Sequence, residues 1–377
     1  MKIAYINKTR WLSNMPSTVF SFMNAYSFAQ NGVETTAIFK HPKDVDMQSY
    51  EKYFGVEALD NFRVETFSDK YLLLRSNESF YIHVNNYLSK NKHDIVITRD
   101  PGYLPFLVRL KKKQGIKVFY QSHNFYADLS IRDDVQETNK AKYNRNENRF
   151  IPEIDGVLAL NGPHKKLYEK YVKIPVFAGR PGLKEVHEAR DNFDQKAILY
   201  SGSFQLKKGL DILIEALSII KDEDFKLILA GGRNKDEIAL VENLLAQKEL
   251  EYKTEITGWL SYSKLEGYLN NATIGVIPLK DIFYNRYLTA PSKLFDYLSF
   301  GIPVVATKLP SVEDLIGHSG CGKLVEAGNP EALADSIMKI LSSHELYNKY
   351  RECSIKKAED YIWKKSGAKM LDFMEKA

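Results

Sequence analysis

The chain has 377 residues, of which 44% are hydrophobic and 12% aromatic, with 53 Lys and Arg against 48 Asp and Glu. At roughly 100–200 residues per domain this length predicts two domains, and the composition excludes a disordered or fibrous protein. Only Cys321 and Cys353 are cysteines, and no apolar run is long enough to cross a bilayer, which excludes a disulfide framework and predicts a cytoplasmic protein without a signal peptide.

The formal net charge of +5 is unevenly distributed along the chain. Residues 1–180 hold 27 Lys and Arg against 19 Asp and Glu, a net +8, whereas the remaining residues hold 26 against 29, a net −3. A basic domain suits nucleic acid, an anionic membrane surface or an anionic ligand, and the charge alone does not choose among them.

The first half alternates short β-branched runs with helical patterns, which is typical of βαβ units and parallel sheets. A helix is predicted over Ser17–Gln30, ending at Asn31-Gly32, and Val176–Asp191 has no periodicity, which predicts a domain boundary near residue 180. The predicted strands are Lys2–Ile6, Glu34–Phe39, Asp94–Thr98, Lys117–Gln121 and Gly156–Leu160.

The same alternation restarts after the boundary. Strands are predicted at Ala197–Tyr200, Lys226–Ala230, Lys253–Ile256, Ile274–Ile277 and Ile302–Ala306. Helices are predicted at Leu210–Ile220, Lys235–Gln247, Ser263–Leu269, Pro291–Phe300, Pro330–Ser342 and Ala358–Lys376. We therefore expect an α/β protein with two Rossmann-like domains, residues 1–180 and 181–360, facing each other across a cleft, and a final helix over 361–377. Ligands of such sheets bind at the carboxyl ends of the strands.

A polar, glycine-bearing loop at Tyr200–Gly209 joins a predicted strand to an amphipathic helix. Loop amides, a helix N-terminus and an adjacent lysine are suited to a diphosphate. The loop matches neither the Walker nor the dinucleotide-binding glycine pattern. A solvated lysine pair in an ordinary loop is the alternative, which this segment alone does not exclude.

A second segment, Pro291–Thr307, predicts a helix followed directly by a buried strand. Asp296 would lie one turn into that helix, where a carboxylate can accept hydrogen bonds from a ribose diol. The alternative interpretation is an exposed i, i+3 ion pair between Lys293 and Asp296.

With these segments in order, the sequence resembles the retaining nucleotide-sugar glycosyltransferases of family 4, which have the GT-B fold. The resemblance rests on YSGSFQLKKGLDILIEAL at Tyr200–Leu217, LILAGG at Leu227–Gly232, ITGWL at Ile256–Leu260 and PSKLFDYLSFGIPVVAT at Pro291–Thr307, continued by LPSVED at Leu309–Asp314. Thr98-Arg99 and Ser122-His123 are weaker matches in the first half.

The resemblance implies a donor site in the second half. Lys208 matches the lysine on the donor diphosphate, and Ser203 stands where many members have an arginine. Asp296 stands at the second glutamate of the E-x7-E motif, which binds the ribose, whereas Leu288 replaces the first. The remaining implied donor contacts are Gly258 and Trp259 beside the base, and Thr289, Ala290 and Ser292 near the sugar and distal phosphate.

In the first half the resemblance implies that His123 lies near the sugar 6-hydroxyl and the reacting centre, although a lone histidine after a strand is more often structural. Asn7, Ser17, Thr18 and Arg99 are implied contacts of the acceptor or the phosphates. Met15-Pro16-Ser17 replaces a glycine pair of the family, and the helix N-terminus there could still face the diphosphate.

The D-x-D triplets Asp44–Asp46 and Asp222–Asp224 are interpreted as solvated surface, so we expect neither an obligatory metal nor a cofactor. Basic runs at Arg109–Lys113, Arg145–Arg149 and Lys165-Lys166 suit a peripheral contact with an anionic membrane, and nucleic acid is not expected.

The function predicted is transfer of a hexose from a nucleotide-sugar donor to a carbohydrate or lipid-linked acceptor, in cell-surface polysaccharide, lipopolysaccharide or glycolipid synthesis. A nucleotide-sugar epimerase with the same fold and a degenerate nucleotide-sugar-binding scaffold remain as alternatives.

Overall fold

The computed structural model describes residues 1–13, 15–42, 49–71, 74–135 and 140–377. Internal contacts divide the chain into two compact units. Unit 1 comprises Met1–Pro181 together with Trp363–Ala377, and unit 2 comprises Gly182–Ile362. The boundaries expected after residues 180 and 360 lie one and two residues before these.

Unit 1 contains a parallel sheet with strand order β3-β2-β1-β6-β7-β8-β9 in the part of the chain described. Its strands are β1 (Lys2–Arg10), β2 (Glu34–Lys40), β3 (Phe62–Phe67), β6 (Ile95–Thr98), β7 (Lys117–Gln121), β8 (Gly156–Ala159) and β9 (Val176–Ala178). A small antiparallel hairpin, β4 (Lys70–Tyr71) and β5 (Leu74–Arg75), follows β3. The helices are α1 (Pro16–Gln30), α2 (Tyr50–Phe54), α3 (Asn77–Lys90), α4 (Leu104–Gln114), α5 (Ala141–Phe150), η2 (Ile151–Glu153), α6 (Gly162–Glu169) and α15 (Trp363–Lys376).

Unit 2 contains a second parallel sheet with strand order β12-β11-β10-β13-β14-β15. Its strands are β10 (Ala197–Gly202), β11 (Lys226–Gly231), β12 (Thr254–Ile256), β13 (Ile274–Ile277), β14 (Val304–Thr307) and β15 (Gly322–Val325). Its longer helices are α7 (Leu210–Ile219), α8 (Lys235–Gln247), α9 (Tyr262–Leu269), α11 (Ser292–Ser299), α12 (Pro310–Ile316), α13 (Pro330–Leu341) and α14 (His344–Ala358). The shorter ones are η3 (Phe193–Gln195), η4 (Leu206–Lys208), η5 (Glu251–Lys253), α10 (Phe283–Tyr287) and η6 (Glu359–Tyr361).

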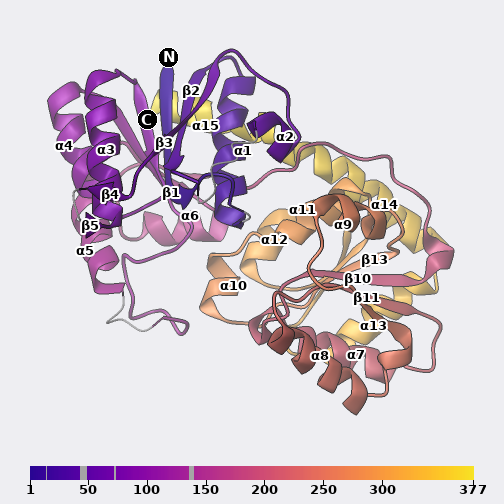
Figure 1. The fold of residues 1–377 in the computed structure, drawn as a ribbon. Helices are drawn as coiled ribbons and strands as arrows, with labels where there is room; N and C mark the ends of the chain where they lie inside the picture. The colour runs from indigo at the N-terminus through magenta and orange to yellow at the C-terminus, as the bar shows by residue number, and fades with distance from the viewer. Residues whose placement is uncertain (14, 43–48, 72–73, 136–139) are drawn as a thin grey trace. The chain divides into compact units, whose positions relative to one another are not determined.

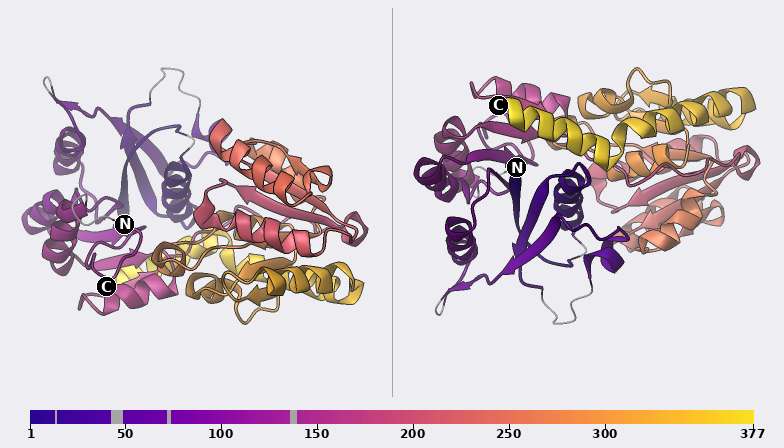
Figure 2. Two further views of the ribbon diagram at one scale, coloured as in Figure 1. Left: turned by 90° about the horizontal axis from the view of Figure 1, so that it is seen from below. Right: turned by 90° about the horizontal axis from the view of Figure 1, so that it is seen from above.

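The two parallel α/β sheets confirm the predicted fold class. Helices cover both faces of each sheet, as parallel sheets require. In unit 1, α3 and α4 lie on one face and α1 and α15 on the other (Figures 1 and 2). In unit 2, α7, α8 and α13 lie on one face and α9, α11 and α12 on the other (Figure 1). Both sheets therefore bury their central strands, which explains the short, nearly uninterrupted apolar runs in the sequence.

Some predicted elements need correction. β1 continues four residues beyond the predicted Ile6, and neither β3 nor β15 was predicted. β9 lies inside the segment interpreted as a linker, because a three-residue edge strand is too short to show a period. The predicted final helix is two helices, because extended backbone at Ile362, which bridges Leu183, interrupts it.

The last helix packs within unit 1. α15 buries Trp363, Met370 and Met374 in the cluster that contains the apolar side chains of α1. Gly367 permits this close approach, since a Cβ at that position would lie 2.4 Å from the Ser27 Oγ. Among the helices described, none is long and apolar enough to span a bilayer.

Candidate functional site

The loop after β10 is held close to its neighbours by glycine. Gly202 ends the strand with φ +121°, and Gly209 has φ +75°. A Cβ at Gly209 would lie 1.6 Å from the Pro278 carbonyl oxygen, so no other residue fits without movement of the backbone. The loop therefore places η4, which carries Lys207 and Lys208, directly beside the carboxyl end of β10.

Lys208 is partly buried, and its ammonium lies 5.6 Å from the ring centroid of Tyr284. Burial lowers the pKa of Lys208 to about 8, and the charges of Lys207 and Arg233 act in the same direction. Asn285 holds the loop that carries Lys207 and Lys208 in place. Its side-chain amide donates to the carbonyls of Lys207 at 2.9 Å and Lys280 at 2.8 Å. Sequence reasoning missed Asn285, which nothing in its neighbourhood distinguishes from a surface amide.

Lys293 enters the same region from the first turn of α11. Its Nζ lies 3.4 Å from the ring centroid of Tyr200, and 3.6 Å from where a Cβ at Gly202 would be. Burial, followed by the charge of Lys208, holds the pKa of Lys293 well below its usual range. The exposed ion pair with Asp296 that the spacing allowed is therefore wrong, since the ammonium is directed to the end of β10.

Asp296 lies one turn further along α11 and is also partly buried. Tyr262 donates a hydrogen bond to its Oδ1 at 3.4 Å, and burial raises the pKa of Asp296 to about 7. The next residue anchors the helix. The Tyr297 hydroxyl accepts from the Ser201 amide at 3.1 Å and donates to the Leu199 carbonyl at 3.0 Å, which fixes α11 against β10.

The carboxyl ends of β11 and β12 supply an aromatic surface. Trp259 is 55% exposed, and the Arg233 guanidinium lies 5.4 Å from its ring centroid. The preceding Gly258 has φ +71° and no neighbour within 4 Å of a Cβ position, which leaves its backbone accessible. Arg233 was not predicted, although it directly follows the LILAGG segment.

The other predicted donor residues differ in their accessibility. Ser292 is exposed and Ala290 partly exposed, whereas Thr289 is buried. Ser203 is partly exposed, and its carbonyl accepts from the Tyr200 hydroxyl at 2.8 Å. Leu288 is 1% exposed, so the position of the absent glutamate is filled by a core side chain.

In unit 1 the structure brings Asn7, Ser17 and Arg99 together. The Arg99 Nη1 donates to the Ser17 carbonyl and to the Ser21 Oγ, each at 3.0 Å, and the Asn7 Nδ2 donates to the same carbonyl at 3.0 Å. Thr18 is fully buried and bonded to Ser13 and Thr9. These polar side chains thus join the start of α1 to the ends of β1 and β6.

His123 follows β7 with an exposed ring. In the described part of the chain no hydrogen bond involves this ring. Desolvation by the surrounding protein atoms lowers the pKa of the His123 imidazole to about 3, and the positive charges of Arg99 and Lys8 act in the same direction. The imidazole is therefore neutral near pH 7 and available to a ligand.

A buried carboxylate supports the segment that follows His123. Glu147 on α5 is 1% exposed and accepts from the Tyr120 and Tyr168 hydroxyls at 3.0 and 2.9 Å, and from the Tyr126 amide at 2.8 Å. Burial raises the pKa of Glu147 to about 7. Tyr168 also bonds Ser122, at 2.9 Å, so this network fixes both sides of His123. In the sequence Glu147 was hidden inside a basic run.

The candidate metal motifs do not form a centre among the described residues. Asp222–Asp224 is an exposed turn after α7, and Asp44–Asp46 lies outside the described ranges. Within those ranges no group of three His, Cys, Asp or Glu side chains could hold a metal ion.

Comparison with known families and curated proteins is consistent with this geometry. Residues 184–357 match the family model described as glycosyl transferases group 1. An uncharacterized glycosyltransferase of Methanocaldococcus jannaschii is 25% identical over 167 residues, 44% of each chain. An amylovoran biosynthesis glycosyltransferase of Erwinia amylovora is 26% identical over 136 residues, 36% of this chain and 33% of that protein. The matched segments thus span less than half of these relatives.

Solved structures match over the whole chain. Sucrose-phosphate synthase from Thermosynechococcus elongatus has a TM-score of 0.76 and 16% identity, covering 100% of this chain and 98% of that one. Anabaena HepE, solved with UDP and glucose, has a TM-score of 0.71 and 13% identity, covering 100% of both. At these identities the likeness establishes the fold.

Proposed function

We propose that this chain, which has the GT-B fold and matches the family of glycosyl transferases group 1 over residues 184–357, is a retaining glycosyltransferase of that family. It would transfer a hexose from a nucleoside-diphosphate sugar to an acceptor hydroxyl. The observation that carries this proposal is the pair of partly buried ammonium groups, Lys208 and Lys293, at the end of β10, with the Asp296 carboxylate one turn away.

The two lysines supply what a leaving diphosphate needs. Neither forms an ion pair with a described carboxylate, and burial lowers the pKa of each lysine. A bound anion would offset that effect and hold both ammonium groups in the charged form. Many members of the family that the sequence resembles have an arginine at the position of Ser203. In this chain Lys293, on α11, would supply that second positive charge instead. Two fixed positive charges in a partly dry site stabilise the charge that develops on the departing nucleoside diphosphate, and this role requires no metal ion.

The rest of the donor fits around this pair. Asp296 would accept hydrogen bonds from the ribose hydroxyls, and the Gly258 backbone with the exposed Trp259 would bind the base, with Arg233 beside it. Thr289, Ala290 and Ser292 would contact the sugar and distal phosphate. UDP is the favoured nucleoside diphosphate, because HepE was solved in complex with UDP and glucose.

On unit 1 the neutral His123 would contact the sugar near the reacting carbon. The N-terminus of α1, which has no acidic residue in its first turn, would direct the positive end of its helix dipole toward the diphosphate. Asn7, Ser17, Thr18 and Arg99 would act by fixing that helix start. Attack from the face that the leaving group departs from, assisted by the departing phosphate, would retain the anomeric configuration.

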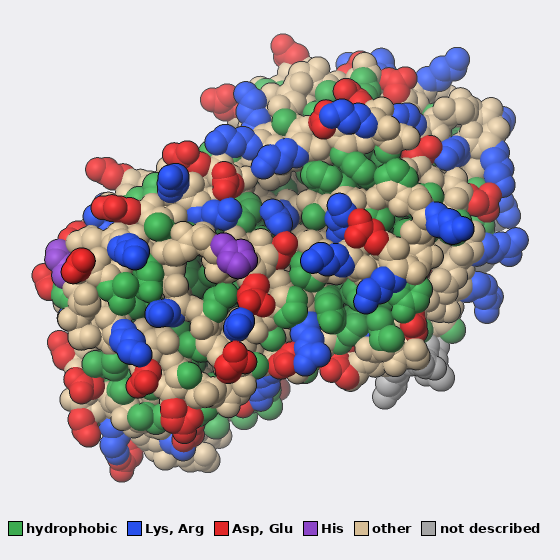
Figure 3. Space-filling model, turned by 180° about the vertical axis from the view of Figure 1, so that it is seen from behind, with side chains coloured by type: hydrophobic (Ala, Val, Ile, Leu, Met, Phe, Trp, Pro, Cys, Tyr) green, Lys and Arg blue, Asp and Glu red, His purple; other side chains and the backbone are tan. Residues whose placement is uncertain are grey.

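The acceptor is proposed to be a carbohydrate or lipid-linked glycan of a cell-surface polysaccharide, lipopolysaccharide or glycolipid, as the relative in amylovoran biosynthesis suggests. Figure 3 shows Lys and Arg side chains gathered along one edge of unit 1. That basic edge suits a peripheral contact with the anionic inner face of a membrane, which would keep a cytoplasmic enzyme beside a lipid-linked acceptor.

The experiment is a thermal-shift and calorimetric screen of UDP-, GDP- and ADP-sugars, followed by product analysis over a panel of acceptors. A ligand bound only by the native state raises its melting temperature. We expect one nucleotide sugar to bind and to yield a glycoside with retained configuration. Absence of all nucleotide binding would exclude the enzyme, conversion of the sugar without acceptor would indicate an epimerase, and binding without turnover would indicate the scaffold that Leu288 allows.

A further inference from the structure

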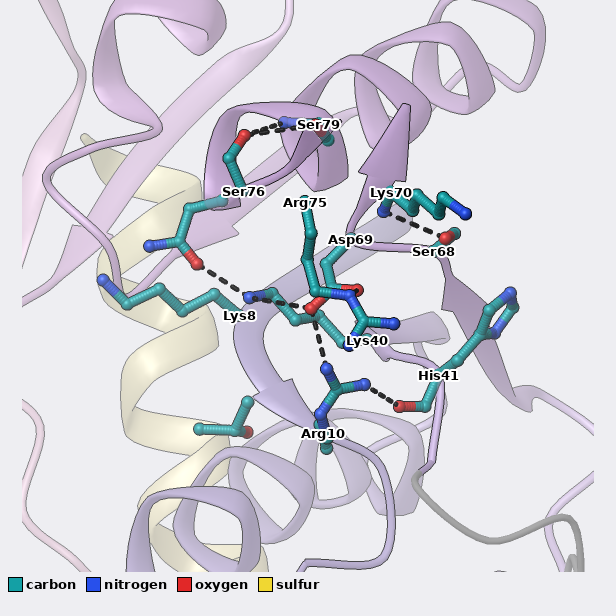
Figure 4. A network of polar contacts seen from close by, with 12 residues as sticks. Lys8, Arg10, Lys40, His41, Ser68, Asp69, Lys70, Arg75, Ser76 and Ser79 are labelled. Carbon is teal, nitrogen blue, oxygen red and sulfur yellow. Dashed lines mark hydrogen bonds and ion pairs between the residues drawn. The ribbon is translucent and has the colours of Figure 1, made fainter. Parts of the chain in front are cut away.

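A second basic site lies in unit 1 and is formed by residues that have no role in the function proposed above. Arg10 ends β1, Lys40 ends β2 and Arg75 lies in β5, and all three surround Asp69, which follows β3. Figure 4 shows their side chains converging on the Asp69 carboxylate. We refer to Arg10, Lys40 and Arg75 as the basic cluster.

Asp69 orders the cluster without neutralising it. The Arg10 Nη2 lies 2.8 Å from Asp69 Oδ2, the Arg75 Nε 3.3 Å from Oδ1, and the Lys40 Nζ 3.9 Å from Oδ2. One carboxylate thus faces three cations, which leaves a net charge of +2. The other ion pairs recorded among the described residues of unit 1 each join one base to one acid, so a carboxylate shared by three bases is unusual within that part of the unit.

The surplus charge is held where water screens it poorly. The Lys40 and Asp69 side chains are only 12% and 10% exposed. Lys40 also donates to the Asn77 Oδ1 at 2.7 Å, and Arg10 donates to the His41 carbonyl at 3.1 Å, so neither side chain is free to move away. Burial and the charge of Arg10 lower the pKa of Lys40, in spite of Asp69. An anion bound here would relieve that repulsion.

The geometry also leaves donors open to solvent. Arg75 is 70% exposed and is oriented only through its Nε, so within the described structure the two terminal nitrogens of its guanidinium have no partner. A planar pair of N–H donors matches two oxygens of a phosphate. The cluster therefore has a net positive charge, side chains held in place by hydrogen bonds, and a solvent-accessible guanidinium group. It lies at the carboxyl ends of three adjacent parallel strands, where such sheets bind ligands.

The cluster is continuous with the residues assigned to the reacting centre. Lys8, two residues before Arg10 on β1, pairs with Asp100 at 2.7 Å and lies near enough to His123 to lower its pKa. The same Lys8 contributes to lowering the pKa of Lys40. A ligand in the cluster would thus occupy the same edge of the sheet as His123.

We propose that Arg10, Lys40 and Arg75, ordered by Asp69, bind a phosphate group carried by the acceptor. That the phosphate belongs to a glycosyl acceptor rests on the proposed function. The presence of a phosphate-binding site at the basic cluster does not depend on that function. The charge of +2 matches a phosphate monoester or diphosphate better than a sugar carboxylate. Such an acceptor is either a soluble sugar phosphate or a glycan linked to lipid through phosphate.

The test is calorimetric titration of the full chain with inorganic pyrophosphate in the presence of a saturating nucleoside diphosphate, which occupies the Lys208 site. We expect Arg10→Gln and Arg75→Gln each to weaken pyrophosphate binding about tenfold or more, as loss of a charge-assisted contact does. Arg63→Gln removes another exposed arginine, near the other end of β3, and should change the affinity less than twofold. Arg75→Lys should give an intermediate affinity.

If no nucleoside diphosphate binds, the proposed function fails, and the same titration on a Lys208→Gln/Lys293→Gln background still tests the phosphate site. Pyrophosphate binding equal to the parent's in both Arg10→Gln and Arg75→Gln would overturn the proposal. So would a tighter response to glucuronate than to pyrophosphate, or binding only to phosphatidylglycerol vesicles with none to soluble phosphates. Sugar phosphates that bind with the same dependence on Arg75 support the soluble source, and vesicles carrying a polyprenyl diphosphate support the lipid source.

Discussion

Lys208 and Lys293 come from different elements, and only the fold brings their ammonium groups to the same end of β10. Because each lacks a described carboxylate partner, both should contribute to diphosphate affinity. We expect Lys293→Gln to weaken binding of a nucleoside diphosphate about tenfold while leaving the affinity of the nucleoside unchanged. Calorimetry with the two ligands measures this.

Lys323→Gln is the matched control, since Lys323 is exposed on β15 and should leave both affinities within twofold of the parent's. Equal losses for nucleoside and nucleoside diphosphate in Lys293→Gln would show that Lys293 acts on the shape of α11 and not on the phosphates.

The perturbed groups of the donor site, Asp296, Lys208 and Lys293, predict a pH optimum, and the lowered pKa of Lys293 acts on the alkaline side together with that of Lys208. The pKa of Asp296 is raised to about 7, so the carboxylate that accepts from ribose is present above that pH. The pKa of Lys208 is lowered to about 8, so its ammonium is present below that pH. Nucleotide-sugar affinity should therefore be highest between about pH 7 and 8 and fall on both sides. The nucleotide sugar itself has no phosphate that titrates in this range.

Titration calorimetry from pH 6 to 9.5 tests this, and Asp296→Asn should abolish the acid limb while retaining the alkaline one. An affinity that stays constant across the range in the parent would contradict the assignment of both groups.

At the scale of elements, the position of α11 depends on one glycine in β13. The Tyr297 ring packs where a Cβ on Gly275 would come within 2.3 Å of it. Gly275→Ala should therefore displace α11 together with Lys293 and Asp296. We expect a loss of about 1–3 kcal/mol in the stability of unit 2, as for other overpacked cores, and a clear loss of nucleotide affinity.

Chemical denaturation and nucleotide titration measure the two effects. Gly267→Ala is the control, because a Cβ there meets nothing within 4 Å and alanine favours the helix, so stability should be unchanged or higher. If Gly275→Ala is destabilised but keeps full nucleotide affinity, the packing of Tyr297 does not determine the geometry of the donor site.

The elements also show what sequence could and could not predict. Long periodic segments such as α8 and the buried strands β7 and β13 have the bounds their patterns predicted, because periodicity is a local property. The edge strands β3, β9 and β15 were missed, since pairing on one side leaves a weak local pattern.

The same distinction applies to the site. The roles of Lys208 and Asp296 follow from motifs contiguous in sequence. Lys293, Asn285 and Glu147 depend on contacts with residues 20 or more positions away, such as Tyr200 for Lys293 and Tyr126 for Glu147, which no local pattern reports.

At the scale of the whole molecule, the uneven charge separates a basic first half from a mildly acidic second half, and the chain path ties both ends of the sequence to unit 1. The basic excess of residues 1–180 includes the cluster around Asp69, whereas the donor residues lie in the mildly acidic unit 2. The chain returns to unit 1 for its last fifteen residues, so the stability of unit 1 depends on both ends of the sequence. A mutation in the last helix should thus affect stability without affecting the donor site.

Met370→Ala tests this separation. Met370 is fully buried on α15 among the apolar side chains that line α1, and its truncation would leave a cavity costing about 2–4 kcal/mol of folding free energy. Nucleotide affinity, measured by calorimetry well below the melting temperature, should stay within twofold of the parent's because Lys208, Lys293 and Asp296 all lie in unit 2. Lys369→Ala, an exposed neighbour on the same helix, should change neither property. A Met370→Ala protein that remains folded but loses nucleotide affinity would show that the donor site depends on α15.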